Sequence, residues 1–157
     1  MKTIAIFADV QNIYYTTRDV YGRAFNYRAF WREVSALGEI VFATAYAIDR
    51  GDDRQIKFQD ALKHLGFNVR LKPYIQRQDG SAKGDWDVGI SIDMLTQAEQ
   101  VDCVILLSGD GDFDLLLKAV RERFATQSIV YAVEKLTARS LIDAADAFQP
   151  IQQSLLI

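Results

Sequence analysis

Aspartates follow two of the apolar stretches of this sequence at positions where strands are expected to end. Asp110, Asp112 and Asp114 lie in the run LLSGDGDFDLLL, and Asp9 ends the first apolar stretch of the chain. Carboxylates that converge repel one another, and Mg²⁺ or Mn²⁺ relieves the repulsion because a hard cation prefers oxygen ligands. Such a cation positions a phosphate and lowers the pKa of a bound water. The pattern therefore predicts a pocket for phosphoryl transfer.

A further acid of this kind stands in the segment KGDWDVGISIDML, which offers Asp87 and Asp93. Six residues on a helix correspond to about 240° of net rotation, so both side chains cannot easily face one cation. Asp87 lies in the first helical turn, where the helix dipole favours negative charge. We therefore expect Asp87 in the pocket and assign Asp93 to backbone or supporting contacts.

Several of these residues also have a plain structural interpretation. Ser108, Asp110 and Asp112 are all good helix caps, and any one of them can serve that purpose alone. Asn12 either reaches back toward Asp9 or caps the residues that follow it. Lys83 is either a cation for a phosphate or a solvated lysine of the loop at residues 76–84.

The elements that must position these residues alternate along the chain. Apolar runs rich in β-branched residues predict five strands, at residues 3–8, 39–48, 68–75, 101–107 and 127–133. Helical spacing predicts helices at residues 27–37, 54–65, 87–97, 113–124 and 137–147. Alternation of this kind is typical of an α/β fold with a mainly parallel sheet, and almost wholly apolar strands indicate helices on both faces. We expect a three-layer α/β/α sandwich in which the acids meet at the carboxyl ends of neighbouring strands.

The composition fits one globular domain over residues 1–157. The chain has a net charge of −3, a single cysteine, Cys103, and a single histidine, His64. One cysteine makes no internal disulfide, which suits a reducing cytoplasm, and the histidine and cysteine content makes zinc chemistry improbable. The first ten residues lack the features of a signal peptide, and no stretch is apolar enough for a membrane span. We expect a cytoplasmic protein with no membrane contact.

The chain resembles the NYN domain proteins of the LabA/DUF88 group, which belong to the PIN-like nuclease superfamily. The matching pieces are FADVQN at 7–12, KGDWDVGISIDML at 83–95, VILLSGDGDFDLLLKAVRE at 104–122 and, more loosely, ARSLIDAADAFQPI at 138–151. The resemblance implies a PIN-like sandwich with a ribonuclease site that depends on Mg²⁺ or Mn²⁺.

Carried over by position, the resemblance assigns the catalytic and metal-binding roles to Asp9, Asp87, Asp110 and Asp112, with Asn12, Lys83 and Ser108 in support. Asp114 departs from the family pattern and, like Asp93, is kept as a supporting residue. Hydrolysis at such a site would leave a 3′-hydroxyl and a 5′-phosphate. A single-stranded RNA would stack on aromatic rings and run along basic side chains. The candidates for that contact are Tyr14, Tyr15, Arg18 and Arg77.

Other classes of protein fit less well. A receiver domain needs an acidic pair after its first strand, a haloacid-dehalogenase phosphatase needs an acid where Gln11 stands, and there is no P-loop. The remaining alternative is a non-catalytic regulator that binds RNA, a nucleotide or a metal in the same acidic crevice. The apolar tail LLI offers a weak indication of a homodimer.

Overall fold

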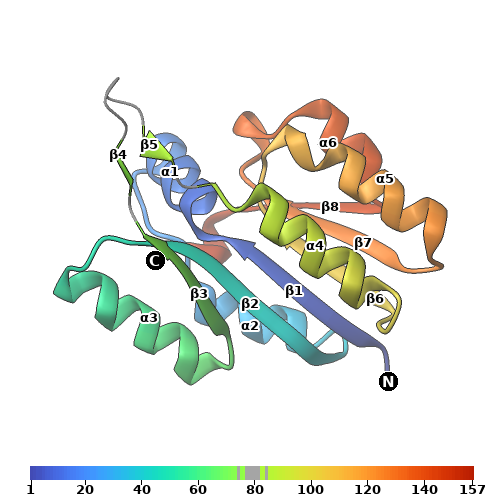
Figure 1. Cartoon of the computed structure of the whole chain (residues 1–157), viewed down its shortest axis with the longest axis horizontal. Coiled ribbons are helices and arrows are strands. Elements are labelled where there is room, and N and C mark those ends of the chain that lie inside the picture. The colour runs from blue at the N-terminus through green and yellow to red at the C-terminus, as the bar shows by residue number, and fades with distance from the viewer. Residues whose placement is uncertain (74, 77–81, 84) are drawn as a thin grey trace.

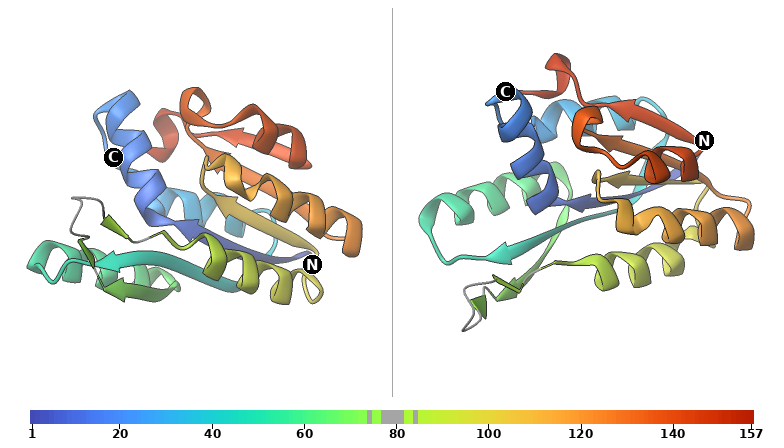
Figure 2. Two further views of the ribbon diagram at one scale, coloured as in Figure 1. Left: turned by 45° about the horizontal axis from the view of Figure 1, so that its top comes forward. Right: turned by 90° about the horizontal axis from the view of Figure 1, so that it is seen from above.

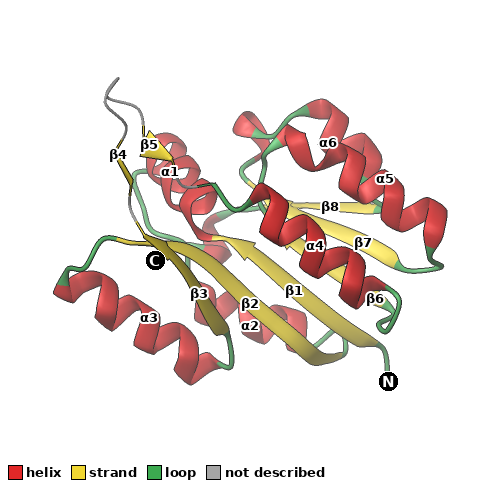
Figure 3. Cartoon of the chain, viewed as in Figure 1, coloured by secondary structure: helices red, strands yellow, loops and turns green. Residues whose placement is uncertain are grey.

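The computed structural model describes residues 1–73, 75–76, 82–83 and 85–157. Figures 1 and 3 show how its elements are arranged. In chain order, the helices and strands are β1 (Thr3–Asp9), α1 (Val10–Tyr21), α2 (Tyr27–Ser35), β2 (Glu39–Asp49), α3 (Asp53–Leu65), β3 (Asn68–Pro73), β4 (Ile75–Gln76), β5 (Ala82–Lys83), α4 (Asp87–Ala98), β6 (Cys103–Leu107), the 3₁₀ helix η1 (Gly111–Phe113), α5 (Asp114–Arg123), β7 (Gln127–Ala132), η2 (Glu134–Leu136), α6 (Arg139–Ala144), β8 (Ala147–Pro150) and η3 (Gln153–Leu155).

The main sheet has six strands in the order β3-β2-β1-β6-β7-β8, and all neighbouring pairs are parallel. The expected α/β fold with a mainly parallel sheet is therefore confirmed. From β1 the chain builds β2 and β3 on one side and then crosses back to build β6, β7 and β8 on the other. The carboxyl ends of β1 and β6 therefore flank the point where the strand order reverses, which is the usual place for a ligand in an open α/β sheet.

Helices cover both faces of this sheet, as the two further views in Figure 2 show. One apolar core joins the sheet to α1, α2 and α3, and it includes Ile13 and Phe30. The other joins the opposite face to α4, α5 and α6, and it includes Met94 and Leu117. The five central residues of β1 are fully buried, because a parallel strand between two helical layers has no solvent face. No helix in the described part of the chain combines the length and the apolar character needed to cross a membrane.

The count of five strands was wrong, because the chain forms a sixth strand where we expected the end of a helix. The helix expected at residues 137–147 is shorter, and α6 ends at Ala144. The backbone N–H of Asp146 then donates to the carbonyl of Ser128, and β8 pairs with β7. β8 lies at the sheet edge, where Pro150 is tolerated, and its sequence AFQP carries no apolar run that would have revealed it.

Two further differences lie near the site. Residues 10–21 form α1, which is not among the helices that the sequence predicted. Only Ile13 and Thr17 of this helix are fully buried, so its apolar stripe is too sparse to recognise. The strand expected at residues 68–75 ends at Pro73 instead, because proline lacks the N–H that would continue the ladder. Ile75 and Gln76 form β4, which pairs antiparallel with β5.

Candidate metal centre

Asp9 is the last residue of β1 and also caps the helix that follows. Its carboxylate accepts a hydrogen bond from the backbone N–H of Asn12 (3.4 Å) and another from the hydroxyl of Ser108 (3.0 Å). Because β1 and β6 are neighbours, a residue just after β6 can reach a carboxylate at the end of β1. The side chain of Asp9 is thus oriented by the first turn of α1 and by the residue that follows β6.

The loop after β6 is tied to the first turn of α1. The backbone N–H of Gly109 donates to the side-chain oxygen of Asn12 (3.0 Å), and the N–H of Asp110 donates to the hydroxyl of Ser108 (3.2 Å). Ser108 is fully buried and serves as donor to one acid and as acceptor from the backbone of the other. Of the two roles considered for Asn12, the structure shows the one directed toward Asp9, because its backbone N–H donates to that carboxylate and its side chain holds the loop. The cap of α1 is Asp9 and not Asn12.

Two glycines of this loop are small for a reason that the sequence did not reveal. Neither Gly109 nor Gly111 has a positive φ, so the conformation of the backbone does not require glycine at these positions. A Cβ on Gly109 would lie 2.8 Å from the hydroxyl of Thr137, and one on Gly111 would lie 2.7 Å from the Cβ of Ala138. The glycines let the segment before α6 pack directly on residues 108–114, which we call the acidic loop.

Asp87 comes from a third element, at the first residue of α4. One carboxylate oxygen each from Asp9, Asp87 and Asp110 lies within 4.8 Å of the others, and all three side chains are half-buried. Figure 1 places the start of α4 and the start of α1 at the same end of β1. We call these three acids the triad.

Burial and neighbouring carboxylates disfavour the ionised forms of two members of the triad. Burial raises the pKa of Asp9 to about 6, although the hydrogen bonds from Ser108 and Asn12 act in the opposite direction. Burial, followed by the charges of Asp110, Asp85, Asp9 and Asp112, raises the pKa of Asp87 to about 7. Carboxylates that keep their protons so readily indicate that a positive charge would be favourable between them.

The other acids of the acidic loop lie outside the triad. Asp110 is a cap as well as a member, because one of its oxygens accepts from the backbone N–H of Asp112 (2.9 Å). Asp112 itself is exposed, and its charge contributes to the raised pKa of Asp87. Asp114 is half-buried at the first residue of α5. We did not single out Asp85, whose charge also acts on Asp9 and Asp87 and whose carboxylate accepts from the N–H of Asp87 (3.2 Å).

Asp93 takes part in a different set of contacts. Its carboxylate accepts the hydroxyl of Tyr46 (2.7 Å) and pairs with the guanidinium of Arg70 (2.6 Å). These bonds hold it against β2 and β3, while Asp87 one and a half turns earlier joins the triad. Tyr46 and Arg70 each lie in a stretch that was expected to form a strand, but their contacts with Asp93 were not predicted.

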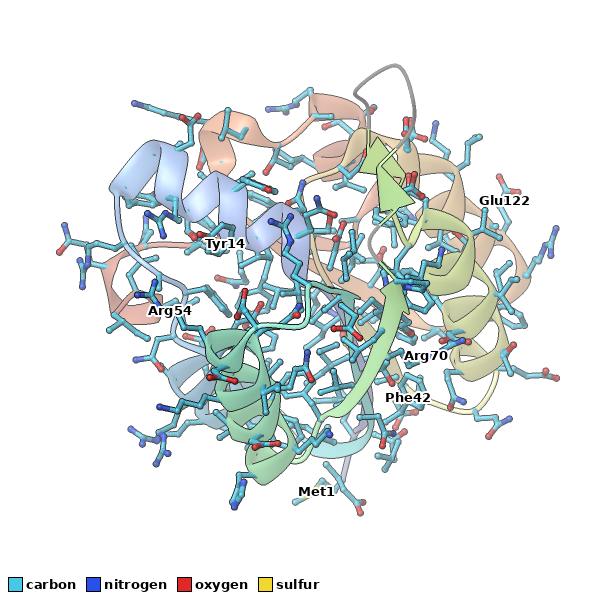
Figure 4. All side chains as sticks on the ribbon, turned by 60° about the vertical axis from the view of Figure 1, so that its left-hand side comes forward. Met1, Tyr14, Phe42, Arg54, Arg70 and Glu122 are labelled. Atoms are coloured by element: carbon cyan, nitrogen blue, oxygen red, sulfur yellow. The ribbon has the colours of Figure 1, made fainter. Side chains whose placement is uncertain are left out.

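Aromatic and basic side chains extend from the site along α1. Tyr14 and Tyr15 are each 50% exposed, and their rings meet edge to face with centroids 5.3 Å apart. The guanidinium of Arg18 lies 5.2 Å from the centroid of the Tyr14 ring, and Arg50 donates to the hydroxyl of Tyr15 (3.3 Å). Figure 4 labels Tyr14 on this helix. Arg77 and the side chain of Lys83, which were also expected to take part in the site, lie outside the described residues.

Comparisons with known proteins agree with this arrangement. Residues 3–152 match the NYN domain family. The chain is 32% identical over 153 residues to the low amplitude and bright protein LabA of Synechococcus elongatus, an alignment that covers 92% of this chain and 81% of LabA. The crystal structure of VPA0982, a protein of unknown function from Vibrio parahaemolyticus, superposes with a TM-score of 0.94 at 50% identity and covers 99% of this chain and 96% of that one. The family expected from the motifs is therefore confirmed, and the chain belongs to the NYN domain family.

Proposed function

We propose that this protein is a ribonuclease that depends on a divalent metal and hydrolyses phosphodiester bonds at the triad. The observation that carries the proposal is the convergence of Asp9, Asp87 and Asp110 from three separate elements at the point where the strand order reverses. The NYN domain is a PIN-like nuclease family, and this supports the same activity.

The side chains of the triad fit a hard cation. They offer oxygen atoms alone. His64 and Cys103 lie at the opposite, amino-terminal end of the parallel strands, where β3 and β6 begin. Oxygen ligands favour Mg²⁺ or Mn²⁺ over zinc. The raised pKa values of Asp9 and Asp87 reflect burial and repulsion between carboxylates, which a bound cation would relieve. When bound, such a cation activates water and neutralises charge on the phosphate.

The residues around the triad keep its oxygens in place. Ser108 and Asn12 direct hydrogen bonds at Asp9 and thereby stabilise its ionised form against burial. Asp110 is held by its own bonds to Ser108 and Asp112. The carboxylate of Asp112 is exposed and can serve as a further ligand to the cation from the solvent side.

The aromatic and basic surface of α1 supports single-stranded RNA as the substrate. Exposed rings stack on bases without regard to sequence, and arginines contact the phosphates. Tyr14, Tyr15 and Arg18 provide both kinds of group on the helix that begins at Asp9. The preference for RNA over DNA rests on family membership, since no described contact would read a 2′-hydroxyl.

The direct test is cleavage of end-labelled single-stranded RNA by the purified protein with Mg²⁺, Mn²⁺ or EDTA. We expect cleavage with either metal, none with EDTA, and loss of activity in the Asp110→Asn/Asp112→Asn double variant. Asp19→Asn, which removes an exposed charge from α1, is the matched control and should cleave normally. If wild type and double variant are equally inert with every metal while RNA or nucleotide binding persists, the chain is a non-catalytic regulator and the proposal is wrong.

A further inference from the structure

The three acids of the triad do not share the same support. Asp9 ends a strand and Asp110 follows one, whereas Asp87 begins a helix whose preceding residues, Asp85 and Trp86, belong to no strand. Four other carboxylates repel its charge. Asp87 would relieve that repulsion by moving away, so an attachment of this segment to the sheet is needed to keep it in the triad.

Trp86 provides one attachment. It is 8% exposed, and its indole N–H donates to the carbonyl of Ala47 in β2 (2.9 Å). Its ring packs against Tyr46 with centroids 5.3 Å apart. Gly89, one turn later, leaves room for the ring, because a Cβ there would lie 2.6 Å from it. The residue before Asp87 is therefore fixed to the carboxyl end of β2.

Two cations of β3 provide the second attachment. The ammonium of Lys72 lies 4.5 Å and the guanidinium of Arg70 lies 5.0 Å from the centroid of the Trp86 ring, within the range of cation–π attraction. Lys72 also donates to the backbone carbonyl of Asp85 (2.8 Å), and Arg70 pairs with Asp93 further along α4. Figure 4 labels Arg70 on β3. Residues on both sides of Asp87 are thus tied to β2 and β3.

We propose that Trp86, with Lys72, is a positioning residue that clamps the segment 85–87 to β2 and β3 and thereby holds Asp87 in the metal site. This inference rests on the proposed function for the metal, but the clamp itself is a property of the protein alone. Residues that orient metal ligands from outside typically change metal affinity about 10–100-fold when they are replaced.

The test compares Trp86→Phe with Trp31→Phe. Both remove an indole, but Trp31 packs on Phe67 and against Gly66, away from the triad. Titration calorimetry with Mn²⁺ should show about tenfold weaker binding for Trp86→Phe and wild-type binding for Trp31→Phe. Lys72→Met, which removes the hydrogen bond to Asp85 and the cation–π contact with Trp86, should weaken binding about threefold. RNA cleavage by Trp86→Phe should recover at saturating Mn²⁺, a rescue that a general loss of packing would not give.

Amide hydrogen exchange of the segment 85–91 separates this inference from the proposed function. We expect faster exchange than in the wild-type protein for Trp86→Phe and wild-type exchange for Trp31→Phe. Exchange and Mn²⁺ affinity equal to those of Trp31→Phe would overturn the clamp. If the wild-type protein binds no Mn²⁺, the proposed function is wrong, and faster exchange in Trp86→Phe would still support the clamp while unchanged exchange would overturn it.

Discussion

The strand ends of β1 and β6 and the start of α4 contribute to the same triad, but they hold their carboxylates differently. Asp9 is half-buried and accepts hydrogen bonds directly on its carboxylate, from Ser108 and from the backbone of Asn12. The contacts described around Asp87 instead fix its neighbours, through Trp86 and Lys72. We call the ends of β1 and β6 the rigid half of the site and the start of α4 the attached half. Substitutions in the two halves should therefore differ in their effects on metal affinity and stability.

The largest effect should follow removal of a triad carboxylate. Asp9→Asn and Asp87→Asn should each weaken Mn²⁺ binding at least about 100-fold, because a lost ligand costs more than a lost outer contact. Asp9→Asn should also raise the melting temperature of the metal-free protein at pH 7, since it removes a half-buried charge that burial disfavours. Titration calorimetry and thermal unfolding check both effects, with Asp19→Asn as the control. Equal Mn²⁺ affinity in Asp9→Asn and the control would contradict the account.

The second effect is a dependence of stability on pH in the absence of metal. The folded-state pKa values of Asp9 and Asp87, about 6 and about 7, lie above the ordinary value of 3.8. Protonation of these groups therefore favours the folded state; this contribution is complete below pH 3.8 and is lost as the pH rises through 6 and 7. For Asp9 the resulting decrease in the free energy of unfolding is about 3 kcal/mol.

Urea unfolding in EDTA at pH 5 and pH 7.5 measures this contribution. The free energy of unfolding should be lower at pH 7.5, the difference should shrink in Asp9→Asn, and excess Mn²⁺ should abolish it. A wild-type protein that becomes more stable over this range without metal would show that the triad carries no unbalanced charge.

A smaller effect should come from the contacts of the rigid half. Ser108→Ala removes the donor to Asp9 and the acceptor for the N–H of Asp110, and we expect about tenfold weaker Mn²⁺ binding. Ser128→Ala is a close control, because Ser128 is also buried and accepts from the N–H of an aspartate, Asp146, at the sheet edge. Both variants should lose stability, measured by urea unfolding, but only Ser108→Ala should lose metal affinity. Equal Mn²⁺ affinity in Ser108→Ala and Ser128→Ala would show that Ser108 does not support the metal site.

The smallest effect should lie outside both halves, on α1. Tyr14→Leu removes one half-exposed ring from the proposed RNA surface and should weaken binding of a single-stranded RNA about fivefold without changing Mn²⁺ affinity. Val41→Leu replaces an exposed apolar residue of β2 and serves as the control. Fluorescence anisotropy with Ca²⁺ in place of Mn²⁺ measures binding, and unchanged affinity in Tyr14→Leu would place the RNA elsewhere.

The sequence predicted the rigid half better than the attached half. Long apolar runs marked β1 and β6, and the rule that ligands bind at the carboxyl ends of parallel strands brought Asp9 and Asp110 together. Asp87 was preferred to Asp93 on helical geometry, but the contacts of Trp86 with β2 and β3 depend on the path of the chain between distant residues. No local pattern encodes such contacts.

The missed elements share a physical cause. α1 buries few residues completely, and β8 is a short edge strand with one proline, so neither carries the periodic apolar signal on which the prediction depended. RNA as the substrate, the cytoplasmic location, a homodimer and the roles of Lys83 and Arg77 stay predictions.

The most direct test of the metal centre is to locate Mn²⁺ by anomalous diffraction in crystals soaked at neutral pH. The account predicts an anomalous peak between the strand ends and the start of α4, within about 2.5 Å of carboxylate oxygens of Asp9, Asp87 and Asp110. A peak elsewhere, or no peak at a concentration that saturates binding in solution, would contradict it.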